Sequence, residues 1–269
     1  MVINDKVNAK TMVVKSNLPA SDYVVNPYIG CPHKCIYCYA SFMKRFTKHR
    51  EEWGDFLDVK NFQIMGRNSL KGKVVLLSSV TDAYNPYEKR YCVVPEILQN
   101  LDSRGAQIEI LTKSSLILRD IDILKKLKNV KVGISLNTLD DSFRKLIEPR
   151  ASSVKERLRV LEVLNKNDIR TYLFVSPIFP EITNISQLLD ATENFVDEYY
   201  FENLNLTGNS KKNVLTVIEK KYPDLLPIYN QIYNKGNMRY WEMKKIEIQS
   251  LFATYPKEMK LFFYHKNLK

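Results

Sequence analysis

The chain has 269 residues, of which 45% are hydrophobic and 26% are charged, and it carries a formal net charge of +11 at pH 7. This balance is typical of a globular protein and excludes an intrinsically disordered chain. The length allows one barrel-sized domain or two smaller ones. No apolar run reaches the roughly 18 residues of a membrane span, and residues 1–15 lack the apolar core of a signal peptide. We therefore expect a soluble, cytoplasmic protein with no membrane partner.

The first predicted strand covers residues 22–28 and ends near Pro27 and Gly30. A cysteine-rich loop follows it, and the segment 36–50 is predicted to be helical. The segment 51–73 contains three glycines and no clear periodicity. We expect this segment to be an irregular surface excursion.

From residue 74 onward, short apolar runs alternate with segments of helical periodicity. The further predicted strands are 74–77, 108–111, 130–136, 172–175 and 199–206. Each strand is followed by a crossover long enough for a helix, which is the pattern of a parallel sheet with right-handed connections. With the first strand this makes six units, too few for a closed eight-stranded barrel. The predicted fold is therefore α/β, an open (β/α)6 partial TIM barrel.

The pattern changes after residue 208. Residues 1–208 are predicted to form the partial-barrel domain with an N-terminal lead-in, and residues 209–269 a helical, aromatic-rich extension packed on the barrel. One stripe at helical spacing consists of Tyr222, Leu225, Tyr229 and Ile232. The favoured interpretation is that these side chains extend the core, and the alternative is a substrate-recognition element.

Three of the four cysteines lie within eight residues, as Cys31, Cys35 and Cys38, spaced C-x3-C-x2-C. Clustered thiolates are soft ligands that suit an iron–sulfur cluster or zinc. Three thiolates leave one position at the metal open, whereas four close a structural site. A zinc site completed by Cys92 is the alternative.

Polar residues or prolines follow several predicted strands at their carboxyl ends. They are Thr81, Lys113, Ser135 and Pro177. Because the carboxyl ends of parallel strands meet at one face of a barrel, we expect these residues to surround one site.

The cysteine motif, in a loop after the first strand of a (β/α)6 pattern, resembles that of the radical S-adenosylmethionine (SAM) enzymes. The flanking residues are similar to those of the spore-photoproduct-lyase-like branch, a family of DNA repair photolyase-like proteins. The matching segments run in the family's order through Asn26–Gly30, Tyr37–Ala40, Thr81-Asp82 with Pro86 and Glu88, Thr112–Ser114, Arg119-Asp120, Glu148–Arg150, Arg157-Leu158, and Pro177-Ile178 with Pro180. They cover more than half of the chain, and the C-terminal quarter carries no usable motif.

The resemblance implies a [4Fe–4S] cluster held by Cys31, Cys35 and Cys38, with S-adenosyl-L-methionine on the fourth iron. It also implies an electron donor such as flavodoxin or ferredoxin. One electron would cleave S-adenosylmethionine to a 5′-deoxyadenosyl radical, which abstracts hydrogen from a substrate.

The same resemblance suggests further cofactor contacts. Tyr37 matches the position that contacts the adenine, with plain packing as the alternative. Lys113 matches the lysine that pairs with the cofactor carboxylate, although an exposed surface lysine would be the ordinary interpretation. The remaining expected contacts are Thr81, Asp82, Ser135, Arg150 and Pro177, where Arg150 could instead brace Glu148.

One departure from the family concerns catalysis. Spore photoproduct lyase uses a cysteine at the end of its second strand as a hydrogen donor, and residues 78–82 contain none. Cys92, about ten residues later, is the candidate donor, with an ordinary buried cysteine as the alternative. We therefore do not expect repair of a spore photoproduct.

The sequence does not identify the substrate. The net charge favours a nucleic acid or nucleotide, and a Lys-rich solvated surface would produce the same charge. We predict a radical SAM enzyme with lyase- or transferase-type chemistry on such a substrate. The alternatives are a radical SAM enzyme that acts on a peptide or small metabolite, and a metal-containing binding or sensing protein.

Overall fold

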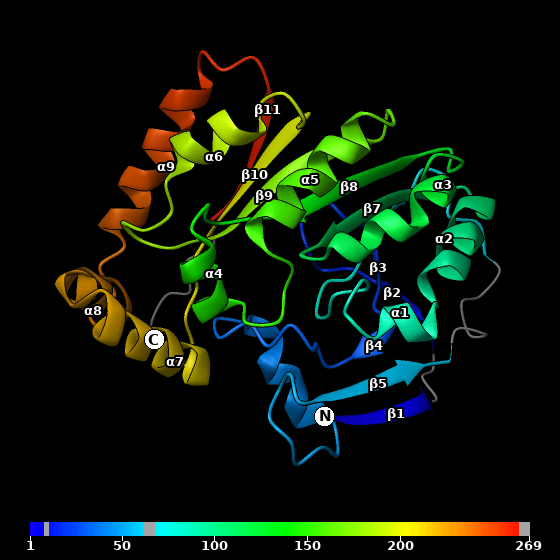
Figure 1. The fold of residues 1–269 in the computed structure, drawn as a ribbon, viewed down its shortest axis with the longest axis horizontal. Coiled ribbons are helices and arrows are strands. Elements are labelled where there is room, and N and C mark those ends of the chain that lie inside the picture. Colours follow the sequence, from blue (N-terminus) through cyan, green and yellow to red (C-terminus); the bar gives the residue numbers. More distant parts are fainter. Residues whose placement is uncertain (8–10, 62–67, 264–269) are drawn as a thin grey trace.

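A computed structural model describes residues 1–7, 11–61 and 68–263. Its main feature is a curved sheet of eight strands in the order β11-β10-β9-β8-β7-β6-β3-β2 (Figure 1). Adjacent strands are parallel except β2 (Val13–Lys15), which pairs with β3 antiparallel at one edge. The sheet is thus an open parallel barrel wall.

All six predicted strands are present and follow one another in space as they do in sequence. They are β3 (Tyr23–Val25), β6 (Val74–Leu77), β7 (Gln107–Thr112), β8 (Val130–Ser135), β9 (Arg170–Ile178) and β10 (Glu198–Asn203). Their continuous apolar runs are explained by burial on both faces, because the outer face carries helices and the inner face lines the barrel. The open (β/α)6 partial barrel is confirmed.

Helices fill the crossovers between these strands. They are α1 (Glu88–Tyr91), α2 (Val94–Ser103), η3 (Ser115–Asp120), α3 (Ile121–Leu124), α4 (Asp141–Ile147), α5 (Val154–Asn165) and α6 (Ile185–Thr192). Figure 1 shows α2, α3 and α5 along the outer face of the sheet. Local sequence explains their starts, since Pro95 lies in the first turn of α2 and Ser153 forms a capping box with Glu156 at α5.

Two local expectations were wrong. The segment 36–50 contains a 3-10 helix, η1 (Tyr39–Phe46), in place of a long helix. The supposedly irregular segment contains β5 (Phe56–Lys60), which lies between β1 (Val2–Val7) and β4 (Tyr28–Ile29) in a small second sheet. Sequence periodicity missed β5 because its first four residues are all buried, including Asp58, which accepts from His49 at 2.8 Å.

The C-terminal region is helical, with one additional strand. It contains α7 (Gly208–Lys221), η4 (Pro223–Leu225), α8 (Leu226–Tyr233), α9 (Arg239–Phe252) and β11 (Glu258–Phe262). The strand β11 was not predicted, and it pairs parallel with β10 as a seventh parallel strand.

The stripe of Tyr222, Leu225, Tyr229 and Ile232 packs in or against the core, which agrees with the favoured interpretation. The hydroxyl of buried Tyr229 donates to the Pro180 carbonyl at 3.1 Å, and Tyr222 packs edge-on against Phe143 of α4 at 5.6 Å between ring centroids. Within the part of the chain that the structure describes, every helix is too short or too polar to cross a membrane.

Candidate active site at the carboxyl ends of the strands

A cavity of about 650 Å³ opens at the carboxyl ends of the parallel strands, a volume in the range of small-molecule sites. The cysteine loop forms one wall, and residues of β6 through β11 and their loops form the others. The predicted site residues on this wall are Cys31, Cys35, Cys38, Tyr37, Thr81, Asp82, Lys113, Ser135 and Pro177. The fold therefore brings together residues that are up to 146 positions apart in the sequence.

The three clustered cysteines are free, partly buried thiols on the cavity wall. Burial raises the pKa of Cys31 to about 12 and raises the pKa values of Cys35 and Cys38 as well. A thiolate in this place therefore needs a cationic partner such as iron, because burial penalises the free anion.

The chemistry of the three thiols suits an iron–sulfur cluster. Across residues 1–7, 11–61 and 68–263, no three His, Cys, Asp or Glu side chains are grouped so that they could ligate one metal ion. In a [4Fe–4S] cluster each thiolate binds a different iron, so the three sulfurs stand farther apart than around zinc. Cys92 is exposed and outside the cavity wall, so it does not complete a zinc site. The thiol donor set fits the cluster.

Hydrogen bonds from the strand ends hold the cysteine loop. Thr81 donates to the Gly30 carbonyl at 2.7 Å, and Asp82 lies 3.3 Å from Nδ1 of His33. Burial is the largest cause and lowers the pKa of His33, while the nearby Asp82 carboxylate acts in the opposite direction. Gly30 itself has a φ of +89°, and an added Cβ would lie 2.4 Å from the Phe56 carbonyl oxygen. Only glycine fits at this entry to the loop.

Asp82 lines the cavity, but the described hydrogen bonds direct its carboxylate toward the scaffold. It accepts from the Thr112 hydroxyl at 2.7 Å and from the backbone N–H groups of Tyr84 and Lys113, each at 2.9 Å. These contacts fasten the end of β7 to the loop after β6. Its geometry is that of a positioning residue.

Lys113 and Ser135 form a polar row on the cavity wall. The Lys113 ammonium donates to the Ser135 hydroxyl at 2.9 Å, and this hydroxyl donates to the Ser176 carbonyl at 3.1 Å. The Lys113 nitrogen also lies 5.9 Å from the centroid of the Tyr37 ring. The cavity thus has a cation beside the cysteine loop, where a carboxylate ligand can bind.

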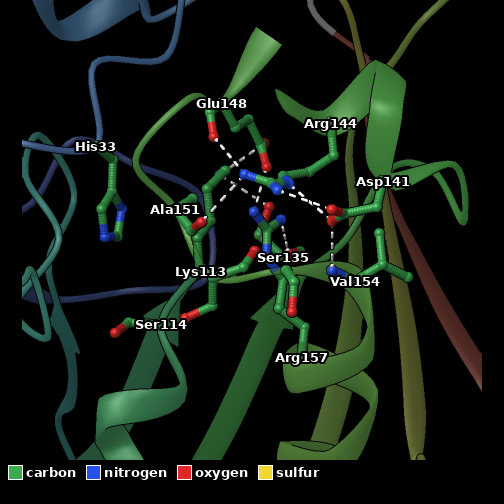
Figure 2. A network of polar contacts seen from close by, with 12 residues as sticks. His33, Lys113, Ser114, Ser135, Asp141, Arg144, Glu148, Ala151, Val154 and Arg157 are labelled. Carbon is green, nitrogen blue, oxygen red and sulfur yellow. Dashed lines mark hydrogen bonds and ion pairs between the residues drawn. The ribbon is translucent and has the colours of Figure 1, made fainter. Parts of the chain in front are cut away.

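Behind this row, Glu148 is a fully buried carboxylate that contacts three groups, and Figure 2 labels two of them, Lys113 and Arg157. It accepts from the Tyr37 hydroxyl and from the Arg157 guanidinium, and it lies 4.0 Å from the Lys113 nitrogen. Burial alone would raise the pKa of Glu148, but the Arg157 and Lys113 charges hold it below its ordinary value.

The Glu148 network also fixes the back of the cysteine loop. The backbone N–H of Ile36 donates to the Ile147 carbonyl at 2.9 Å, and that of Arg150 donates to the His33 carbonyl at 3.3 Å. Figure 2 shows the Arg157 guanidinium close to Ser135, and its Nη1 donates to the Ser135 carbonyl at 3.0 Å. The Glu-Pro-Arg and Arg-Leu motifs therefore brace the loop from outside the cavity.

Two predicted site residues lie elsewhere. The Arg150 guanidinium donates to the Gly54 carbonyl at 2.9 Å and pairs with Asp55 at 3.2 Å, outside the cavity wall. These side-chain contacts are with the segment before β5 and not with Glu148, the residue that Arg150 was expected to brace. Cys92 ends α1 as an exposed residue with a φ of +49°, also outside the cavity wall. A thiol in that place does not face the cavity where a substrate radical would form.

Sequence reasoning missed two carboxyl groups on the cavity wall, those of Glu109 and Glu202. Glu202, near the end of β10, accepts from the Ser176 hydroxyl. Burial raises the pKa of Glu202, while the Ser176 hydrogen bond and the Lys113 charge act in the opposite direction. The sequence placed Glu202 only in the middle of the last predicted strand, 199–206, and gave no strand-end signal for it.

Comparisons with known proteins agree with this geometry. The family model described as the radical SAM superfamily matches residues 25–190. An uncharacterized protein of Methanocaldococcus jannaschii is 38% identical over 232 residues, which cover 86% of each chain. An uncharacterized protein of Acidianus two-tailed virus is 28% identical over 252 residues, covering 82% of this chain and 83% of its own.

Solved structures share the fold at low sequence identity. Spore photoproduct lyase complexed with dinucleoside spore photoproduct has a TM-score of 0.71 at 14% identity, over 97% of this chain and 82% of that chain. Streptococcus suis SuiB bound to precursor peptide SuiA has a TM-score of 0.52 at 18% identity, over 89% and 48% of the two chains. Both likenesses concern the barrel and its loops.

Proposed function

The chain belongs to the radical SAM superfamily, and on that premise we propose that its cavity is the site of a hydrogen-abstraction reaction. The family uses a [4Fe–4S] cluster and S-adenosylmethionine, which when bound supply a 5′-deoxyadenosyl radical. The observation that carries the proposal is that Cys31, Cys35 and Cys38 share one cavity wall with Lys113 and Ser135.

Each residue of this wall has a proposed task. Cys31, Cys35 and Cys38 ligate three irons, and the Lys113 ammonium binds the carboxylate of the cofactor. Ser135 holds Lys113 in place through the 2.9 Å hydrogen bond. Tyr37 presents its ring to the cavity while its hydroxyl is held by Glu148.

An external one-electron donor, of the flavodoxin or ferredoxin class, would supply the electron that the cluster chemistry needs. Arg150 and Cys92 have no proposed role in binding the cofactor.

We infer that the substrate is a nucleic acid or nucleotide. The net charge of +11 supports this choice, since a basic surface attracts polyanions. Structures with this fold hold a dinucleoside in one case and a peptide in another, so the fold leaves the substrate class open.

Anaerobic reconstitution with iron and sulfide tests the reaction type. The wild-type protein should turn brown and, with dithionite and S-adenosylmethionine, form 5′-deoxyadenosine. Cys35→Ala should lose most cluster iron and all cleavage, because one iron loses its only protein ligand. The matched control is Cys92→Ala, which should retain both, since its thiol is exposed and outside the cavity wall. A colourless wild-type protein without 5′-deoxyadenosine would refute the proposal.

A further inference from the structure

Glu202 is the carboxyl group of the cavity wall with the most open hydrogen-bonding capacity. A carboxylate has about four acceptor sites, and the Ser176 hydroxyl occupies one of them. Asp82, in contrast, accepts from Tyr84, Thr112 and Lys113. Among the described residues, no lysine or arginine forms an ion pair with Glu202.

The charges of the cavity are arranged so that its interior does not favour phosphate. Its wall contains the carboxyl groups of Asp82, Glu109 and Glu202, against the cations Lys113 and Arg45. Lys113 is the proposed partner of the cofactor carboxylate, and Arg45 lies on the exposed helix η1. A phosphate deep inside would therefore lie near the Glu202 carboxyl group, which forms no ion pair with a described lysine or arginine.

Flat aromatic side chains line the wall beside Glu202. Tyr200 lies 4.5 Å from Tyr172, 6.3 Å from Phe174 and 5.7 Å from Phe262, measured between ring centroids. All four rings belong to the cavity wall, on the adjacent strands β9, β10 and β11. Such walls accept a planar, mostly apolar group with polar edges, such as a nucleobase.

Exposed aromatic side chains and an unpaired cation surround the mouth of the cavity. Tyr39, Phe42 and Phe46 of η1 are 51%, 45% and 67% exposed. The Arg45 guanidinium lies 5.4 Å from the Phe42 centroid and 4.6 Å from that of Phe46, and no carboxylate of the described residues pairs with it. Stacking rings beside a free cation are the features of single-strand nucleic-acid binding sites.

We propose that the cavity receives one unpaired base of a nucleic-acid strand, whose N–H donors bind the Glu202 carboxylate while Arg45 holds a neighbouring phosphate outside. This inference rests on the proposed function and names the part of the substrate that enters. A base has to leave its stack to reach such a cavity, so a single strand binds better than a duplex. Guanine presents two adjacent N–H donors to a carboxylate and is the preferred base.

The test uses cluster-loaded protein with S-adenosylmethionine under anaerobic conditions. The probes are fluorescent oligothymidylates of about 12 nucleotides, within the footprint range of single-strand sites, with a central guanine or inosine. Inosine lacks the exocyclic amino group. We expect the wild type to bind the guanine strand about tenfold more tightly by fluorescence anisotropy, within the range of a bidentate base contact.

Glu202→Gln should abolish this preference, because an amide replaces one of the two acceptor oxygens with an NH₂ donor and cannot form the parallel pair of hydrogen bonds. The matched control is Glu219→Gln, an exposed carboxylate on α7, which should retain the preference. If Glu202→Gln does not fold, Glu202→Asp keeps the charge but withdraws the carboxylate, and it should reduce the preference.

Arg45→Gln should lower the slope of log affinity against log salt by about one, the signature of one lost phosphate contact. Arg239→Gln, exposed on α9, is its control, and Glu202→Gln should leave the slope unchanged.

Three results would overturn the inference. The first is a wild type that does not distinguish guanine from inosine, and the second is a preference that survives Glu202→Gln. The third is weaker binding of S-adenosylmethionine by Glu202→Gln, which would assign Glu202 to the cofactor. Formation of 5′-deoxyadenosine without any oligonucleotide tests the proposed function separately. A failure of the base-binding inference can therefore be distinguished from a failure of the proposed reaction.

Discussion

Glu148 and Arg157 form an ion pair with no exposed surface on either side chain. Such a pair is weak evidence of net stabilisation, because both charges lose their hydration. Its effect here is positional, since Glu148 also binds the Tyr37 hydroxyl and Arg157 also binds the Ser135 carbonyl. Two residues of the candidate site are thereby held from behind by one buried pair.

Glu148→Gln should lower the free energy of unfolding by about 3–5 kcal/mol, because it leaves the Arg157 charge buried without its partner. Since the pKa of Glu148 is lowered in the folded state, its stabilisation is present above the ordinary value of 4.5 and is lost as pH falls below it. Urea unfolding of the variant at neutral and acidic pH measures both effects. Glu162→Gln, in an exposed pair with Lys166, should cost less than about 1 kcal/mol. Equal losses in the two variants would contradict this account.

Lys113→Ala should retain the cluster and weaken S-adenosylmethionine binding by about 10- to 100-fold, the range of one hydrogen bond to a charged group. Calorimetric titration of the cluster-loaded protein measures this affinity. Lys212→Ala, exposed on α7, is the control. An unchanged affinity would remove Lys113 from the cofactor site.

At the scale of the elements, the packing of a β9 side chain across β8 depends on one glycine inside the barrel. An added Cβ at Gly133 would lie 2.0 Å from the ring of Tyr172, which is fully buried and leans across β8. Tyr172 in turn contacts Tyr200 of β10, so this glycine positions the aromatic wall of the cavity. Strand propensity alone would favour a β-branched residue at this position.

Gly133→Ala should lower the free energy of unfolding by about 1–3 kcal/mol, the usual cost of overpacking. The cost should fall when Tyr172→Leu is present, because the smaller side chain leaves room for the new methyl group. Denaturant unfolding of the two single variants and the double variant measures this coupling. Additive effects would show that Gly133 and Tyr172 do not interact as described.

At the scale of the whole molecule, the two ends of the chain close the site in different ways. The strand β11 extends the parallel sheet beyond β10 and supplies Phe262 to the cavity wall. Near the N-terminus, the loop between β2 and β3 supplies Leu18 to Ser21 to the same wall. The cavity is therefore bounded by segments from both ends of the chain.

The sequence by itself determined the six-strand parallel order, the cysteine motif and the strand-end positions of Lys113 and Ser135. These features depend on local periodicity and on short spacings between residues. Both can be recognised in the sequence without knowledge of tertiary contacts. Only the tertiary structure decided that Arg150 turns to Asp55, that Cys92 lies outside the cavity wall, and that Glu202 faces the cavity. The physical reason is that the direction of a side chain depends on partners far away in sequence, and no local pattern encodes those partners.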